Sequence, residues 1–201
     1  MNSKRAKTPS PHQGPGVVRI ISGRWKGRRL PVLTAEGLRP TTDRVKETLF
    51  NWLMSDIDGR RVLDCFSGSG SLALEALSRH AAFATMIELD PKAAKLLQQH
   101  LSTLQCSNAE VIAKNCLTVL STRPAQPYDV VFIDPPFRQH LVLPCIQALE
   151  TQGWLADEAL IYVECEKELD LSSMPAHWRL LKEKVAGQLS YRLYQAISQQ
   201  P

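Results

Sequence analysis

The stretch LDCFSGSGSLALEAL, Leu63 to Leu77, joins a short apolar run to a helical pattern through two glycines. Gly68 and Gly70 allow the backbone to turn tightly and to lie close to a ligand. The helix that begins after them presents free backbone N–H groups to an electron-rich group. Asp64 ends the preceding strand, where ligands bind in open α/β sheets. The stretch therefore predicts a strand, a glycine loop and a helix N-terminus that together hold a ligand.

The chain that surrounds this stretch alternates between strand and helix patterns. From Arg61 onward the expected strands are 61–66, 83–89, 109–114, 128–134 and 159–166, and the expected helices are 71–79, 91–104, 116–122 and 139–150. Such alternation is typical of βαβ units that build a parallel sheet. Two further strands, 178–187 and 190–197, have a short link and must pair antiparallel. We therefore expect an α/β, Rossmann-like domain with a mostly parallel seven-stranded sheet and an antiparallel C-terminal strand.

The residues ahead of this domain form a separate N-terminal region. VVRIISGRWKGRRLPV, Val17 to Val32, has two β-prone runs around residues 23–27 and predicts a basic β-hairpin. A helix is expected over Thr41–Leu53, because apolar residues recur there with helical spacing behind a Thr/Asp cap. The predicted domains are a disordered basic tail over 1–16, a hairpin and helix extension over 17–58, and the main domain over 59–201.

The charge of the chain is distributed unevenly. Residues 1–35 contain eight Lys or Arg and no Asp or Glu. The other 16 basic residues and all 20 acidic residues follow, so the rest of the chain carries a net charge of −4. A basic arm on a mildly acidic body indicates a polyanionic partner that the N-terminal region contacts. The plainer alternative is a tail that only improves solubility.

Other classes of site and location receive little support. The five cysteines are odd in number and widely spaced, with no C-x-x-C pair, and the five histidines are scattered. We therefore expect neither a disulfide framework nor a zinc site, and we assign no metal. The N-terminus lacks the apolar core of a secretory signal, and no apolar run approaches the roughly 18 residues of a spanning helix. We expect a cytoplasmic monomer without a membrane partner.

A second carboxylate indicates the kind of ligand. Glu88 ends the second strand, 24 residues after Asp64, where it can accept both hydroxyls of a ribose. Two features disfavour a dinucleotide: the third position of the glycine motif is Ala73, and the acidic residue before the loop would repel a pyrophosphate. That acidic residue suits an ammonium group instead. S-adenosylmethionine has both a ribose and such an ammonium.

The stretch YDVVFIDPPFRQ, Tyr128 to Gln139, ends a buried strand on a carboxylate. A run this apolar would not end on Asp134 without a reason, and the two prolines that follow fix the backbone and leave carbonyls without a competing N–H. A carboxylate and a carbonyl can accept the two protons of an exocyclic amine and orient its nitrogen. Phe137 offers a face on which an extruded base can stack. The alternative is a strand that Pro-Pro simply terminates.

Together these residues resemble the class I S-adenosylmethionine-dependent methyltransferases that modify amino groups, because D-P-P-F is a variant of their [DNS]-P-P-[FYW] signature. More narrowly, ISGRWKGRRL, RPTTDRVKETLFNWL, VLDCFSGSGSLALEALSR, IELD, FIDPPF and YRLY look like the RsmD-type family of bacterial 16S ribosomal RNA guanine-N2 methyltransferases. The resemblance runs from about Val17 to Ile197. It implies the class I methyltransferase fold, S-adenosyl-L-methionine as cofactor, and one methyl transfer to the exocyclic N2 of a specific guanine in 16S rRNA of the small ribosomal subunit.

The resemblance also implies roles for individual residues. Those that would hold the cofactor are Asp64, Phe66, Ser67, Gly68, Ser69, Gly70, Glu88 and Asn115. Those that would hold the target amine are Asp134, Pro135, Pro136 and Phe137. Asn115 departs from the family pattern, which often has an Asp near the adenine. An amide oxygen can still accept a hydrogen bond from the adenine amino group.

Several residues of the N-terminal region are candidate RNA contacts. They are Arg24, Trp25, Lys26, Arg28, Arg39, Thr41 and Arg44. The tryptophan, which lies between basic residues, could stack on a base, but a tryptophan packed in the hairpin is an equal alternative. Capping and surface charge are equally good explanations of Thr41 and Arg44.

The sequence is also compatible with three other functions. A DNA or RNA adenine-N6 methyltransferase could use the same D-P-P-F chemistry, because that motif does not select the ring. A nicotinamide-dependent dehydrogenase could use the glycine loop and Glu88, but it has no use for D-P-P-F. A non-catalytic RNA-binding assembly factor could have kept the fold.

Overall fold

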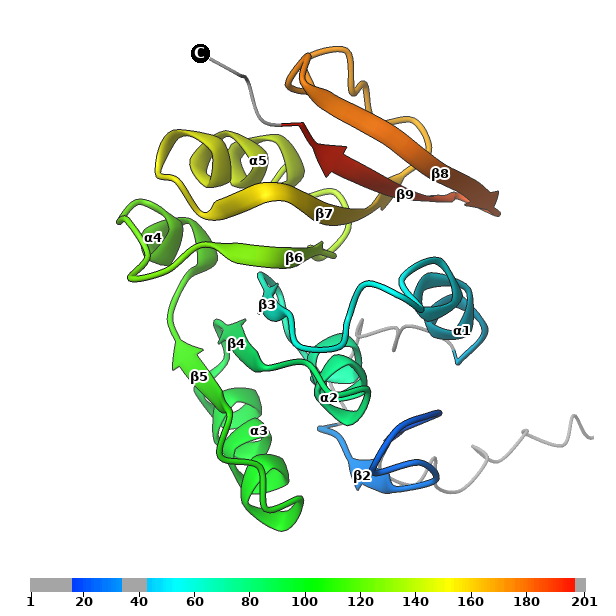
Figure 1. Cartoon of the computed structure of the whole chain (residues 1–201), viewed down its shortest axis with the longest axis vertical. Helices are drawn as coiled ribbons and strands as arrows, with labels where there is room; N and C mark the ends of the chain where they lie inside the picture. The colour runs from blue at the N-terminus through cyan, green and yellow to red at the C-terminus, as the bar shows by residue number, and fades with distance from the viewer. Residues whose placement is uncertain (1–15, 34–42, 198–201) are drawn as a thin grey trace, which may run out of the picture.

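The computed structural model describes residues 16–33 and 43–197, and its centre is a seven-stranded sheet (Figure 1). The strand order is β5-β4-β3-β6-β7-β9-β8. The strands are β3 (Arg61–Asp64), β4 (Phe83–Glu88), β5 (Ala109–Ala113), β6 (Tyr128–Ile133), β7 (Leu155–Glu166), β8 (Trp178–Ala186) and β9 (Leu189–Ala196). The helices are α1 (Asp43–Trp52), α2 (Ser71–Ser78), α3 (Pro91–Thr103), α4 (Cys116–Leu120) and α5 (Val142–Thr151).

The pairing of the strands creates a topological switch point in the middle of the sheet. β3 pairs in parallel with both β4 and β6, and β6 pairs in parallel with β7. The chain therefore builds the sheet outward from β3 in one direction and then returns to extend it in the other. β9 is antiparallel to both β7 and β8. The predicted α/β class, the mostly parallel sheet and the antiparallel C-terminal strand are confirmed.

Apolar side chains cover both faces of the sheet and form two cores. One core contains residues of α1, α2 and α3, and the other contains residues of α4 and α5. All eight residues of α2 are buried, because the helix packs against the sheet on one side and the N-terminal region on the other. A helix that is buried on every side explains why its sequence SLALEALS is almost entirely apolar or small.

The expected hairpin is present, and it packs against α2. β1 (Val17–Arg19) pairs antiparallel with β2 (Arg29–Pro31), as Figure 1 shows beside α2. The Glu75 carboxylate accepts hydrogen bonds of 2.8 and 3.0 Å from the backbone N–H groups of Ile21 and Ser22. The Ser78 hydroxyl donates to the Ser22 carbonyl at 2.6 Å and accepts from the Trp25 backbone N–H at 3.0 Å. The polar groups of α2 thus replace part of the backbone pairing that the short hairpin lacks.

A buried ion pair adds α1 to this packing. Lys46 is 1% exposed, and its ammonium donates to the Arg19 carbonyl and lies 3.8 Å from the Glu75 carboxylate. Burial lowers the pKa of Lys46, and the carboxylate of Glu75 opposes that shift. The hairpin, α1 and α2 therefore share one polar cluster inside one core. The domain boundaries at 17–58 and 59–201 stay a prediction, and the tail predicted over 1–16 lies outside the described residues, apart from Gly16.

Within the described residues, two expected boundaries differ from the observed ones by three residues or more. β7 begins at Leu155 and not near 159, because Leu155 pairs with Tyr128 ahead of an irregularity in the register. Glu158 lies within this segment at φ 57°, so the strand signal is interrupted there. α5 begins at Val142, three residues later than expected, after His140 at φ 54°. Within the described ranges, no helix has the length and apolar character needed to cross a membrane.

Candidate active site

The carboxyl ends of the central strands bring three predicted site residues to one edge of the sheet. Asp64 is the last residue of β3, and in the register it lies beside Met86 of β4 and Phe132 of β6. Glu88 and Asp134 each lie two residues beyond these neighbours, so their side chains project on the same face. The sequence therefore assembles a row of carboxylates at the switch point, where open α/β sheets bind ligands.

The glycine loop runs across this edge and is fixed by backbone hydrogen bonds. Gly68 and Gly70 adopt φ values of 50° and 76°, in the left-handed region that the predicted tight turn requires. The Ser67 N–H donates to the Ile87 carbonyl at 2.9 Å, and the Gly68 N–H donates to the Glu88 carboxylate at 2.7 Å. A Cβ on Gly70 would lie 2.5 Å from Leu97 Cδ2, so a side chain at this position would require Leu97 to move. Phe66 and Ser69, the other predicted loop contacts, are half-buried.

Asp64 is the most buried carboxylate of the row, at 2% exposure. Burial raises its pKa to about 7, and the neighbouring charges of Asp134 and Glu88 add to the rise. Hydrogen bonds from the backbone N–H groups of Ala73 and Phe66 act in the opposite direction. One free N–H of the α2 N-terminus is thus used by this side chain. A crowded set of acidic groups of this kind favours a cationic ligand.

A fourth acidic residue, which is not among the predicted site residues, joins the row. Glu164 on β7 is 6% exposed, and burial together with the charge of Asp134 raises its pKa to about 8. The Tyr162 hydroxyl donates a 3.0 Å hydrogen bond to its Oε2. The available signal was a glutamate inside the apolar strand pattern ALIYVECE, next to a tyrosine on the same face.

The D-P-P-F turn leaves β6 at the same edge. Asp134 is half-buried, Pro135 is buried and Pro136 is exposed. The Phe137 ring is 41% exposed, as a face that stacks on a base must be. The next residue, Arg138, has φ 59° and donates its backbone N–H to the Glu166 carboxylate of β7. The turn is therefore tied to the neighbouring strand.

Asn115 has a local role in the fold. Its side-chain oxygen accepts a 3.3 Å hydrogen bond from the Thr118 N–H and caps α4. The same oxygen was expected to accept from an adenine amino group. It has a second lone pair for this purpose, and the residue is exposed.

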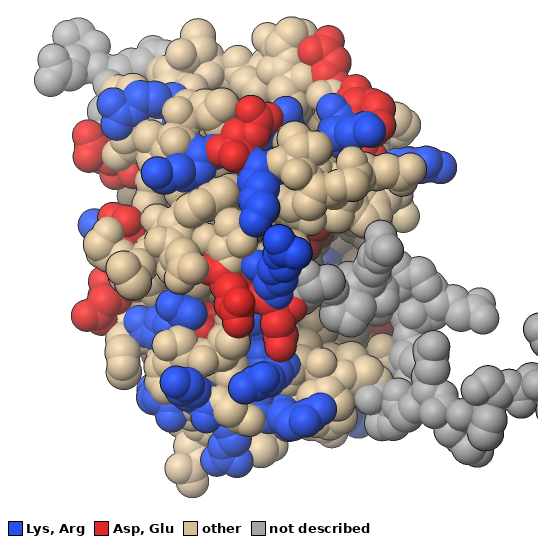
Figure 2. Space-filling model, turned by 90° about the vertical axis from the view of Figure 1, so that its right-hand side faces the viewer, with Lys and Arg blue, Asp and Glu red and all other residues tan. Residues whose placement is uncertain are grey.

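The predicted RNA contacts lie on two surfaces. Arg24, Lys26 and Arg28 are exposed on the hairpin together with Arg29. On the face of the molecule that Figure 2 shows, Lys and Arg side chains gather in the lower part, where the hairpin lies. Trp25 is only 9% exposed and belongs to the core, with the Arg24 guanidinium 3.8 Å from the centre of its ring. The structure thus favours the packed alternative for this tryptophan. Arg39 and Thr41 lie outside the described residues.

Arg44 lines a cavity of about 310 Å³ between α1 and the last three strands. The residues around it are Arg44, Val45, Thr48, Leu49, Trp52, Tyr162, Lys184, Val185, Ala186 and Tyr191. Tyr162 connects this cavity to the row of carboxylates, because its hydroxyl contacts Glu164. Apolar and aromatic walls with two basic side chains suit part of a nucleotide.

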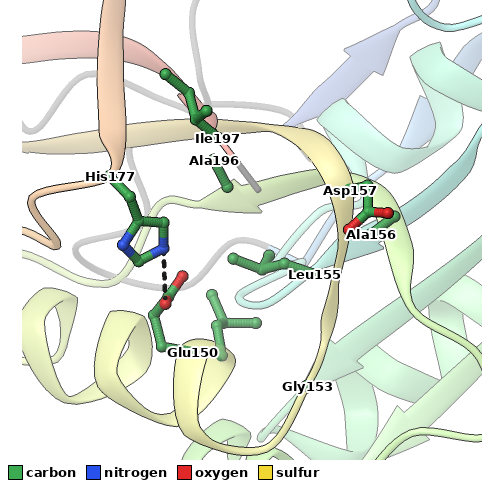
Figure 3. A pocket seen from close by; sticks show the side chains of 9 residues that line it. Glu150, Gly153, Leu155, Ala156, Asp157, His177, Ala196 and Ile197 are labelled. Atoms are coloured by element: carbon green, nitrogen blue, oxygen red, sulfur yellow. Dashed lines mark ion pairs between the residues drawn. The ribbon is translucent and has the colours of Figure 1, made fainter. Parts of the chain in front are cut away.

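A second cavity lies at the opposite end of the strands. It has a volume of about 160 Å³, and Leu155 at the start of β7 and Ala196 at the end of β9 contribute to its lining. Figure 3 shows the ion pair between the His177 Nε2 and the Glu150 carboxylate, 3.0 Å apart, in its wall. Because it lies at the amino ends of the parallel strands, this cavity is not part of the site described above.

Three cysteines that are far apart in the sequence come together in the core that contains α4 and α5. The sulfur atoms of Cys65, Cys116 and Cys145 lie within 4.8 Å of one another, and all three side chains are buried. Mutual hydrogen bonds lower the pKa of Cys116 to about 5 and, together with burial, raise that of Cys145. Spacing in the sequence gave no indication of this cluster, because each residue lies on a different βα unit.

Comparisons with known proteins agree with this geometry. The family model described as "Conserved hypothetical protein 95" matches residues 18–195. The ribosomal RNA small subunit methyltransferase D of Escherichia coli (strain K12) is 55% identical over 188 residues, 94% of each chain. The protein of the same name from Haemophilus influenzae is 53% identical over 195 residues, 96% of this chain and 99% of that one.

A solved structure adds the same relationship in three dimensions. The putative methyltransferase yhhF from Escherichia coli matches with a TM-score of 0.85 and 53% sequence identity, covering 92% of this chain and 100% of that one. The predicted resemblance and the class I methyltransferase fold are therefore confirmed. The chain belongs to the family described as conserved hypothetical protein 95 and, like these relatives, is a methyltransferase.

Proposed function

We propose that this protein transfers a methyl group from S-adenosyl-L-methionine to the exocyclic N2 amine of one guanine in 16S rRNA. The observation that carries the proposal is the D-P-P-F turn, which leaves β6 at the edge where Asp64 and Glu88 end their strands. Relatives that are more than half identical over nearly the whole chain have names that specify the small ribosomal subunit RNA. The dehydrogenase alternative has no support in this family.

The residues of the edge fit the cofactor. S-adenosylmethionine supplies an activated methyl group on a sulfonium and carries a second cationic group, its ammonium. Asp64 has the burial and the crowded negative surroundings that favour such a cation, and its carboxylate would hold the ammonium. Glu88, which already accepts from the Gly68 N–H, would also accept the ribose hydroxyls. The loop from Phe66 to Gly70 would lie against the cofactor, and Asn115 would meet the adenine.

The D-P-P-F turn would hold the target amine. The lone pair of an exocyclic amine is delocalised into the ring, so the amine is a poor nucleophile. Asp134 and a proline-fixed carbonyl would accept its two protons and turn its nitrogen toward the methyl donor. Phe137 would stack on the base, which contributes roughly 1–3 kcal/mol by analogy with single-stranded complexes. The amine proton leaves during or after methyl transfer, so no strong base is required beforehand.

The N-terminal region would provide contact with the RNA. Exposed basic residues on the hairpin would bind phosphates. Arg44 would lie near the pocket, together with Arg39 and Thr41, which are outside the described residues. We further propose that the enzyme acts as a monomer in the cytoplasm, where its substrate is assembled. The three proposed segments, 1–16, 17–58 and 59–201, divide these tasks between an RNA arm and a catalytic domain.

The test is mass mapping of 16S rRNA from cells that lack this protein, followed by restoration with the purified enzyme. We expect one N2-methylguanosine to be missing and to return when small subunits from these cells are incubated with enzyme and S-adenosylmethionine. Parallel reactions with protein-free 16S rRNA report the preferred assembly state. A complete set of methylguanosines, or a missing methyladenosine, would overturn the proposal.

A further inference from the structure

The D-P-P-F turn holds an amino group but does not select the ring that carries it. Adenine, cytosine and guanine all have an exocyclic amine, so a guanine enzyme needs a further contact. Among these three bases, only guanine also has an N–H on the ring, at N1, directly beside the carbon that carries its amino group. The other two bases have a ring nitrogen lone pair at the corresponding position. A hydrogen-bond acceptor placed beside Asp134 would therefore recognise guanine.

The register of the sheet places Glu164 in that position. Phe132 pairs with Tyr162 and Ile133 pairs with Val163 in the parallel β6–β7 ladder. One step further, Asp134 lies beside Glu164, on a neighbouring strand about 4.8 Å away. Side chains alternate between faces along a strand, so Glu164 projects on the same face as Tyr162, and Asp134 on the same face as Phe132. The two carboxylates are therefore lateral neighbours above one core.

The electrostatics agree with this proximity. Burial raises the pKa of Glu164 and that of Tyr162, and the charge of Asp134 adds to both rises. Glu164 is 6% exposed and lies on the face that is otherwise filled by the apolar core of α1 and α2. A second buried carboxylate beside the first costs stability. A pair of acceptors is, however, what the adjacent N1–H and N2–H donors of guanine require.

Tyr162 orients this second acceptor. Its hydroxyl donates to Oε2 of Glu164 at 3.0 Å, and its ring packs edge-on against Phe132 with ring centres 6.4 Å apart. Tyr162 also lines the 310 Å³ cavity that Arg44 and Lys184 border. An extruded nucleotide that enters from this cavity would meet Glu164 and Asp134 together.

We propose that Glu164 selects guanine, by accepting the N1–H of the target base while Asp134 and a proline-fixed carbonyl accept the protons of its N2 amine. This inference rests on the proposed function and names the residue that gives it its substrate specificity. Tyr162 is a positioning residue that holds the Glu164 carboxylate. With Glu164 ionised, above its pKa of about 8, an adenine or cytosine in the same place would turn a lone pair toward the carboxylate and lose the hydrogen bond. A site that forms a buried hydrogen bond with its substrate discriminates strongly against analogues that cannot form that bond.

The experiment uses 2-aminopurine, which keeps the 2-amino group but has no N1–H. Small subunits are reconstituted with 16S rRNA that carries either guanine or 2-aminopurine at the target position. Methyl transfer is measured as kcat/KM at a pH above the Glu164 pKa of about 8, where the carboxylate is ionised. The wild-type enzyme should prefer guanine by about 100-fold or more. Glu164→Gln should lose about 100-fold on guanine but gain relative to wild type on 2-aminopurine, because an amide N–H can donate to N1.

Two further variants separate recognition from folding. Glu168→Gln alters an exposed carboxylate just beyond the same strand and should keep the wild-type preference. Tyr162→Phe keeps the ring and the carboxylate, and it should lower kcat/KM on guanine without reversing the preference. Cofactor affinity, measured by calorimetry, should be unchanged in all three variants, which a merely structural role of Glu164 would not predict.

The outcomes distinguish this inference from the proposed function. Failure of the wild-type enzyme to methylate guanine would overturn the proposed function itself. Two results would overturn only the role of Glu164, provided that guanine is methylated efficiently. One is an equal rate on 2-aminopurine, and the other is an undiminished guanine preference in Glu164→Gln. If Glu164→Gln does not fold, the wild-type ratio and the Tyr162→Phe variant still decide, since equal rates on the two bases exclude an N1–H contact.

Discussion

The Glu88 carboxylate accepts a 2.7 Å hydrogen bond from the Gly68 backbone N–H, which ties the glycine loop to the end of the next strand. A second bond of 2.8 Å comes from the Asp90 N–H. The group proposed to hold the ribose is thus fixed before a ribose arrives. Such preorganisation reduces the entropy that binding would otherwise cost.

Glu88→Gln should weaken S-adenosylmethionine binding about 10-fold. The amide keeps one oxygen for the loop but can no longer accept from both the loop and two hydroxyls. Titration calorimetry measures the affinity, and Glu47→Gln on the exposed side of α1 is the control. Equal affinities in the two variants would argue against a ribose contact at Glu88.

Asp134→Ala should reduce turnover by roughly 100-fold or more, because one of the two acceptors of the target amine is lost. Cofactor affinity should change little, since Asp134 is proposed to contact the amine. Single-turnover methylation of small subunits and calorimetry give the two quantities. Retention of full turnover would require a different way of orienting the amine.

Cofactor affinity should rise with pH up to about 7 and then level off. Asp64 has its pKa raised to about 7 by burial, so below that pH a proton must leave before the carboxylate can pair with an ammonium. Asp64→Asn should bind weakly and with a flat profile over the same range. Calorimetry between about pH 5.5 and 8.5 tests this, and a wild-type profile that is flat below 7 would contradict it.

Two glycines of the hairpin should respond very differently to alanine. Gly23 and Gly27 both have positive φ, 78° and 84°, so each substitution costs about 1–2 kcal/mol of backbone strain. A Cβ on Gly23 would also lie 1.8 Å from the Ser78 carbonyl oxygen, whereas Gly27 has nothing within 4 Å. Gly23→Ala should therefore cost at least about 3 kcal/mol in total. Denaturant unfolding provides the comparison, and equal losses would mean that the hairpin does not pack closely on α2.

Charge reversal on the hairpin should weaken RNA binding and reduce its salt dependence. The variant replaces Arg24, Lys26, Arg28 and Arg29 with glutamate, and all four are exposed. If each contacts a phosphate, the slope of log affinity against log salt should fall by about 3. The matched control reverses Arg179 and Lys182 on β8, which are also exposed. A slope unaffected by the first variant but reduced by the second would move the RNA surface to β8.

The helices and strands could be predicted from the sequence, because interactions within a few residues determine them. The strands and helices alternate as expected, because apolar runs and caps such as Asp90, which accepts from the Lys92 N–H at 2.7 Å, act within a few residues. The carboxylate row was partly predicted, because Asp64 and Glu88 end strands of one parallel sheet and Asp134 directly follows a third. Glu164 was missed because its partnership with Asp134 depends on which strands are neighbours.

Lateral and long-range contacts account for the other omissions. The basic residues around Trp25 are compatible with either an exposed or a packed ring. The ring is buried because α2 lies against the hairpin, and the local sequence does not reveal that contact. Glu75 reads as an ordinary helix residue, yet it binds the backbone of a hairpin more than 50 positions earlier. The cysteine cluster needs three βα units in register. None of these relationships has a signature within a short window of sequence.

The hydrogen bonds between α2 and the hairpin have a consequence for folding during synthesis of the chain. Synthesis proceeds from the N-terminus, so Ile21 and Ser22 leave the ribosome well before Glu75. Glu75 follows them by 54 and 53 residues, and only then can its carboxylate accept their N–H hydrogen bonds. Until then the nascent hairpin has no surface to dock on, and it is the most basic part of the chain. Folding of this region must wait for a long-range contact, which slows it relative to the local βα units. A shortened gene product that stops before Ser78 would therefore leave the basic segment without its partner.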